Sequence, residues 1–372
     1  MRFVNAGFTF GSKIFLYFLL FGMPLNAQTF PLKVKDTNLV TKDQGPFLVN
    51  GRGADIYSNF TSELYNLQRY SYLGINTAFV TFSQKNLELT KKGQPTRDTR
   101  KKLKLLRRFA REASLYNIAV FVNIEEPDLS QDYYIRNKFL QYAFKTLFRN
   151  KNISWIFSQQ DINAETSALN KNQLIAVQNT NDSGTAHFFI QTKSPLLNQR
   201  SSKPLVLLTT IDSNQPDSIY QTTRETAYAG IMNGAAGIIT LNKSSVNTLY
   251  NPASQQLKQW AATFDSIPWQ NFVSYPELIA HETDNLNICA VTTRDSALAA
   301  VYSKRLTTLH LNLGSYKSNL KLTWINTFNG KVLETVINPI PHNQLFMSPL
   351  TDSNASEWLL IMRTLPLKNS NK

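Results

Sequence analysis

Acidic residues follow several apolar, strand-like segments of this chain. The five in this position are Asp55, Glu125, Glu126, Asp161 and Asp212. Two carboxyl groups that face one cleft can hydrolyse a glycosidic bond, at a separation of roughly 5 Å or 6.5–9.5 Å; one protonates the leaving oxygen and the other acts as nucleophile or base. The aspartates are equally typical of helix caps and loop turns, and the two glutamates also suit a solvated loop. These residue types therefore indicate either acid–base chemistry or simple capping.

Segments that alternate between strand-like and helix-like patterns must position these acids. Helices are predicted over residues 61–73, 97–111 and 133–148, and strands over 74–82, 118–124, 153–158, 186–191, 205–210 and 236–241. Alternation of this kind favours a parallel α/β fold, and its even spacing favours a closed (β/α)8 TIM-type barrel over an open sheet. In such barrels the reactive groups lie just past the carboxyl ends of the strands, which is where the acids stand.

The pattern changes to short, often alternating apolar runs after about residue 285. Asn329-Gly330 lies between two of these runs and is a hairpin signal. We therefore predict a small antiparallel β-sandwich after the barrel. The expected organisation is a signal peptide over 1–27, the barrel over 28–284, the β-sandwich over 285–365 and a polar tail over 366–372.

The first residues have the features of a secretion signal. Arg2 and Lys13 supply positive charge, an apolar run of about nine residues covers 14–22, and the small residue Ala27 follows. The run is too short to cross a bilayer of roughly 30 Å, so a cleaved signal peptide is expected, with no stable membrane insertion afterwards. The predicted location is the periplasm or the cell exterior. Cys289 is the only cysteine, which excludes an intrachain disulfide.

The formal net charge of +14 is consistent with binding to nucleic acid, to a membrane surface or to an acidic polysaccharide. The densest basic stretch, residues 97–111, has leucines between its charges and reads as an amphipathic helix with a solvated face. The sequence contains no nucleic-acid-binding motif and no phosphate-binding loop, so we expect no nucleic-acid partner. An acidic glycan is still a candidate partner. The four histidines lack ligand spacing and no serine-hydrolase motif occurs, so we expect no metal and no cofactor. The oligomeric state has no sequence signal.

An ordered series of short motifs across about residues 31–363 resembles the apiosidase-like bacterial glycoside hydrolases. That family joins a (β/α)8 barrel to a C-terminal β-domain labelled collagen-binding. The motifs that carry the resemblance are Pro31-Leu32-Lys33-Val34, Pro46-Phe47-Leu48-Val49, Gly53-Ala54-Asp55-Ile56-Tyr57, Leu73-Gly74-Ile75-Asn76, Asn152-Ile153-Ser154-Trp155-Ile156, Gly234-Ala235-Ala236-Gly237, Pro268-Trp269, Tyr275-Pro276, Arg294-Asp295, and residues 324–330. The resemblance implies a polysaccharide or oligosaccharide partner of plant or bacterial origin.

The chain departs from this family where the family carries its two catalytic acids. Gln160 stands in the place of the first, an aspartate after the fourth strand, and Asp161 is one residue later. Thr209 stands near the place of the second, a glutamate after a Lys-Pro strand, and Asp212 is the next acid. Neither Gln160 nor Thr209 can act as a carboxylic acid.

Two hypotheses follow from these departures. In the first, Asp161 and Asp212 are the catalytic acid and base, with Asp55, Tyr57, Glu125, Gln160 and Thr209 lining the sugar site. In the second, the barrel is a catalytically inactive pseudoenzyme that serves as a carbohydrate-binding or structural module.

Overall fold

The computed structural model describes residues 30–82, 88–90, 92, 94–124, 133–158, 173–178, 186–192, 202–211, 216–242, 252–280, 288–304, 308–316, 318–337, 343–347, 349 and 357–366. None of the helices within these ranges is long and apolar enough to cross a membrane.

Eight parallel strands close into a barrel, so the predicted fold class is confirmed. The strands follow one another around the barrel in chain order, and the last pairs with the first. They are β3 (Val49–Gly53), β4 (Thr77–Phe82), β5 (Ala119–Ile124), β6 (Ile153–Ser158), β7 (Leu174–Gln178), β8 (Phe188–Gln191), β9 (Leu205–Ile211) and β10 (Gly237–Asn242).

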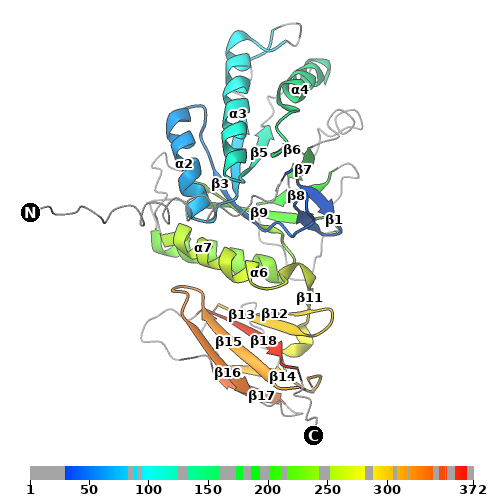
Figure 1. Ribbon diagram of the computed structural model, residues 1–372, viewed down its shortest axis with the longest axis vertical. Helices are drawn as coiled ribbons and strands as arrows, with labels where there is room; N and C mark the ends of the chain where they lie inside the picture. Colours follow the sequence, from blue (N-terminus) through cyan, green and yellow to red (C-terminus); the bar gives the residue numbers. More distant parts are fainter. Residues whose placement is uncertain are drawn as a thin grey trace, which may run out of the picture.

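The described helices follow five of these strands and form part of the outer layer of the barrel (Figure 1). They are α2 (Phe60–Tyr72), α3 (Arg97–Leu115), α4 (Tyr133–Leu147), α6 (Pro216–Met232) and α7 (Pro252–Asp265). The basic segment forms α3, whose first turn is capped by the Thr96 hydroxyl accepting from the Thr99 backbone N–H. Leu103, Leu106 and Phe109 of α3 are buried, and most of its cations are exposed, as the amphipathic pattern predicts.

The C-terminal region contains a six-stranded antiparallel sheet, in agreement with the predicted β-sandwich. Its order is β11 (Phe272–Ser274), β12 (Ile288–Thr293), β13 (Leu298–Ser303), β18 (Trp358–Thr364), β15 (Leu320–Asn326) and β16 (Val332–Ile337). A second sheet of two strands, β14 (Thr308–Asn312) and β17 (Asn343–Met347), contributes Leu309 and Leu311 to the core on one face. The predicted domain boundary at residue 284 lies outside the described residues, and β11 precedes it in the chain.

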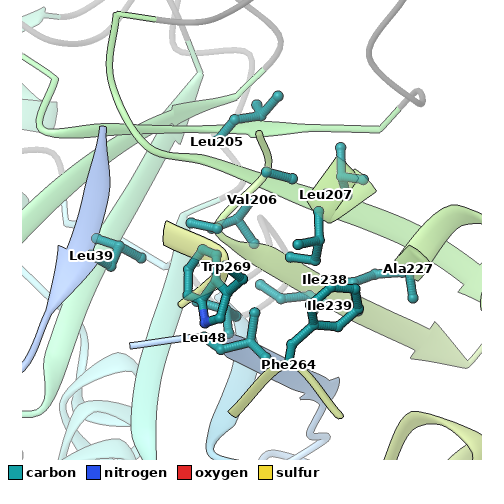
Figure 2. Close-up of a cluster of buried hydrophobic side chains, with 14 of the residues drawn as sticks. Leu39, Leu48, Leu205, Val206, Leu207, Ala227, Ile238, Ile239, Phe264 and Trp269 are labelled. Carbon is teal, nitrogen blue, oxygen red and sulfur yellow. The ribbon is translucent and has the colours of Figure 1, made fainter. Parts of the chain in front are cut away.

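The other face of the six-stranded sheet packs against the barrel through α6 and α7, which lie between the two parts in Figure 1. One continuous apolar cluster joins them, from Val206 in the barrel through Phe264 of α7 to Ile361 of β18. Figure 2 shows its barrel side, where Leu207 and Ile238 lie near Ala227 and Phe264. The hairpin of β1 (Lys33–Lys35) and β2 (Asn38–Val40) adds Leu39 to the same cluster.

Candidate active site at the carboxyl edge of the barrel

The direction in which each strand residue faces decides which side chains reach the barrel mouth. Phe121 of β5 and Phe188 of β8 belong to strands that are not neighbours, yet their ring centroids are 5.3 Å apart. Their contact must therefore cross the barrel interior. Because side chains alternate along a strand, residues two places further on face the same way.

A ring of uncharged polar residues lies above this aromatic layer. Asn123 is two places beyond Phe121, and Gln178 is two places beyond Ala176, the register partner of Phe188. Thr81 lies two places beyond Phe79, which pairs with Phe121. Thr210, at the end of β9, also faces the interior, so the interior-facing polar groups near the carboxyl edge include Thr81, Asn123, Gln178 and Thr210.

Thr210, rather than Thr209, faces the interior at the end of β9. Leu207 points outward, since a Cβ added at Gly230 of α6 would lie 2.5 Å from its Cδ1. Alternation then turns Thr209 toward the helical layer and Thr210 toward the mouth. The exposure of the two residues agrees, because Thr210 is exposed and Thr209 is half-buried.

Asp55 and Tyr57 lie in the turn that follows β3. The Asp55 carboxylate is exposed and accepts a hydrogen bond from the Ser58 backbone N–H at 3.1 Å, which is the geometry of a turn cap. The Tyr57 ring packs edge-on against Phe82 at 5.4 Å, on the helical side of the barrel wall. Its hydroxyl is buried and has no hydrogen-bond partner among the described residues, and burial raises its pKa well above the usual value.

A buried polar cluster behind β3 holds this turn in place. The Arg52 guanidinium donates to the Ser254 hydroxyl of α7 at 3.1 Å, and the Tyr70 hydroxyl donates to the Glu63 carboxylate at 2.7 Å within α2. Glu63 also accepts from the Asp55 backbone N–H. Burial raises the pKa of Glu63, although these hydrogen bonds and the charge of Arg52 oppose the change. The cluster therefore ties α2 and α7 to the base of the candidate site.

Four of the predicted site residues lie outside the described residues. They are the two predicted catalytic residues, Asp161 and Asp212, and the predicted sugar-binding residues Glu125 and Gln160. In the chain, Asp161 follows β6, the fourth barrel strand, and Asp212 follows β9, the seventh. Their roles stay predictions.

No group of three or more potential metal ligands occurs within the part of the chain that the structure describes. His187 accepts a hydrogen bond at Nδ1 from the Ile175 backbone N–H at 3.1 Å, and burial lowers its pKa. Cys289 is buried, and burial raises the pKa of its thiol to about 11. The surroundings of His187 and Cys289 are therefore those of residues that stabilise the fold.

The described edge can bind hydroxyl-bearing ligands, because its amide and hydroxyl groups both donate and accept hydrogen bonds. Sequence reasoning missed Thr81, Asn123, Gln178 and Thr210 as a set. Their common signal is a polar residue at the last or next-to-last position of a mainly apolar strand.

The fold is similar to that of solved glycoside hydrolases. A structure described as a glycoside hydrolase matches with a TM-score of 0.75 and 13% identity, covering 90% of this chain and 97% of the other. A glycoside hydrolase family 5 protein from Bacteroides vulgatus matches with a TM-score of 0.74 and 14% identity, covering 91% and 95%. At these identities the likeness concerns the fold. No protein-family model and no curated protein sequence matches the chain.

Proposed function

We propose that this chain is an exported, glycoside hydrolase-like protein that binds a polysaccharide at the carboxyl edge of its barrel and hydrolyses it through Asp161 and Asp212. The observation that carries the proposal is the ring of Thr81, Asn123 and Gln178 with Thr210. Sugar hydroxyls need neutral groups that both donate and accept hydrogen bonds, and these side chains provide them at the edge where barrel enzymes bind their substrates.

The two acids have positions in the chain that suit this role. One follows the fourth barrel strand and the other the seventh, so the catalytic groups would come from different strands, as is usual in barrel enzymes. Glycoside hydrolysis needs one of them protonated and the other ionised. The resemblance of residues 31–363 to the apiosidase-like family supports a bacterial protein in the periplasm or outside the cell, acting on a plant or bacterial polysaccharide.

The second candidate function is carbohydrate binding without hydrolysis. The observation that favours it is that Thr81, Asn123, Gln178 and Thr210, which face the interior at this edge, are all uncharged. A pseudoenzyme of this kind would keep the sugar-binding residues and lack a functional acid pair.

A combined hydrolysis and binding screen against plant and bacterial polysaccharides tests both candidates. We expect Asp161→Asn and Asp212→Asn each to lower hydrolysis by about 100-fold or more, because each removes a group that transfers a proton or attacks the sugar. Binding should stay close to that of the unmodified protein. Binding by the unmodified protein without any turnover would select the second candidate. Unchanged hydrolysis in both variants would refute the assigned acids.

Thr210→Val should weaken binding of the glycan found in that screen by about fivefold to tenfold, since one hydrogen-bonding group is lost from the mouth. Thr209→Val is the matched control and should bind normally, because Thr209 faces the helical layer. Titration calorimetry of both variants provides the comparison. A larger loss in Thr209→Val would show that the assignment of the two faces is wrong.

A further inference from the structure

A groove of about 360 Å³ lies between the end of α7 and the barrel-facing side of β15, β16 and β18. Ile325, Val332 and Ile361 give it an apolar floor, and Ser266, the residue after α7, lies on the opposite wall. Helices of a (β/α)8 barrel run antiparallel to the strands, so the end of α7 lies at the amino ends of the strands. The groove is therefore remote from the carboxyl edge.

Two cations stand side by side in this groove. Lys321 of β15 and Arg363 of β18 are direct register partners, and both line the groove. Like charges in directly opposite positions of neighbouring strands are destabilising. Lys321 has an ion pair with Glu334 at 2.8 Å, and Arg363 has no acidic partner among the described residues. Of the charged residues that line the groove, Lys321 and Arg363 are positive and Glu334 is negative. The groove therefore has an excess of positive charge, which a bound anion would compensate.

The remaining groups suit a sugar. Ser266 donates its hydroxyl hydrogen to the Thr263 backbone carbonyl at 2.7 Å, so its oxygen lone pairs stay available to accept from a ligand hydroxyl. The apolar floor can cover the C–H face of a sugar ring. A volume of this size falls within the range of ligand sites, roughly 300–1,000 Å³, and such sites are common between domains.

We propose that this groove binds a carboxylate-bearing sugar of an acidic polysaccharide, with Arg363 and Lys321 holding the carboxylate. The inference that the carboxylate belongs to a sugar rests on the proposed function. The inference that the groove binds an anion rests on its charged residues alone. A site at this position would anchor a long acidic chain apart from the barrel mouth. The anchor would raise the local concentration of the polymer at the protein without taking part in hydrolysis.

Titration calorimetry at low ionic strength with trigalacturonate, and with the neutral galactotriose as its counterpart, tests the proposal. Trigalacturonate should bind and galactotriose should not. Arg363→Gln should weaken trigalacturonate binding by about tenfold or more, since a charge-assisted hydrogen bond is lost. Glu334→Gln should strengthen it several-fold, because the carboxylate that competes for Lys321 is removed. Arg294→Gln is the matched control: it removes an exposed arginine of the same β-domain that does not line the groove.

Three results would overturn the inference. Equal binding of both trisaccharides would remove the need for the carboxylate. Equal losses in Arg363→Gln and Arg294→Gln would reduce the effect to the overall charge of the protein. Binding of inorganic sulfate with the same dependence on Arg363 and equal affinity would show an anion site without sugar selectivity.

The proposed function and this inference fail separately. Thr210→Val should leave trigalacturonate binding at the groove unchanged, and Arg363→Gln should leave binding at the barrel mouth unchanged. Thermal denaturation provides the folding check: removing the like-charge pair should not lower the Tm of Arg363→Gln. If that variant proves unstable, the gain expected for Glu334→Gln still decides the matter, and no gain there would count against the site.

Discussion

Gly237→Ala is expected to lower the free energy of unfolding by more than about 4 kcal/mol. Losses of this size usually come from backbone strain or severe defects in the core. Gly237 is the first residue of β10 and has φ of +144°, which side-chain-bearing residues rarely adopt. A Cβ at this position would lie 2.1 Å from the Val49 carbonyl oxygen and 2.6 Å from the Val49 Cα. Neither backbone can move away, because the pairing of β10 with β3 closes the barrel.

Gly234→Ala is the matched control in the same turn between α6 and β10. Gly234 has φ of +88°, and an added Cβ would have nothing within 4 Å. Only the backbone penalty remains, about 1 kcal/mol. Chemical denaturation of both variants measures the difference in free energy of unfolding. Similar losses would mean that the contact with Val49 is relieved by a small shift, contrary to our expectation.

Glu357→Gln is expected to lower the free energy of unfolding by about 3–5 kcal/mol, because it leaves the buried Arg224 charge without its counter-ion. The Arg224 Nε donates to Glu357 Oε2 at 2.8 Å, and the Tyr302 and Thr327 hydroxyls donate to the same oxygen. Both ionic side chains are less than 10% exposed. Burial alone would lower the pKa of Arg224, but the hydrogen bond and charge of Glu357 outweigh it and the pKa is raised.

The Arg224–Glu357 pair links the barrel to the C-terminal sheet, so its loss should weaken the contact between these two parts. Arg224 belongs to α6 of the barrel and also donates to Gln256 of α7, whereas Glu357 immediately precedes β18 of the C-terminal sheet. We expect the unmodified protein to unfold in one transition and the variant in two steps, one for each part. Differential scanning calorimetry detects this directly.

The same substitution at Glu334 is the control for a solvated ion pair. The side chains of Lys321 and Glu334 are 38% and 50% exposed, so screening by water leaves their attraction little net effect. Glu334→Gln should therefore unfold almost as the unmodified protein does. Equal losses at Glu357 and Glu334 would show that burial does not set the strength of the Arg224 pair.

Most of the fold could be predicted because the strands and helices carry their own patterns. Residues 153–158 match a predicted strand at both ends, and the Asn329-Gly330 hairpin joins β15 to β16 as expected. Two barrel strands lack such patterns. β3 reads Val-Asn-Gly-Arg-Gly, and its polar Asn50 and Arg52 donate to the Gly74 carbonyl after α2 and to the Ser254 hydroxyl of α7. β7 is an apolar run of five residues, which periodicity alone does not assign to a strand.

The candidate site was less predictable because a side chain's direction depends on register. Thr209 and Thr210 are adjacent and chemically identical, yet one faces the helices and the other the mouth. The packing of Leu207 on α6 and the different exposure of the two threonines distinguish them. The direction of Asn123 also depends on the tertiary structure. Phe121 contacts Phe188 across the barrel interior, so Asn123, two places further along β5, faces the interior as well.

The barrel architecture and the β-rich C-terminal region follow from the sequence itself, because periodicity and turn residues act over a few neighbouring positions. The inward ring at the mouth, the Arg224–Glu357 pair and the opposed cations Lys321 and Arg363 depend on the tertiary structure. Each joins residues from elements far apart in the chain, and their separation is set by barrel closure and sheet register. The acids that follow β6 and β9 in the chain can be identified from the sequence alone. The uncharged groups that we expect to bind a sugar could be identified only from the closed barrel, because strand register decides which side chains face its interior.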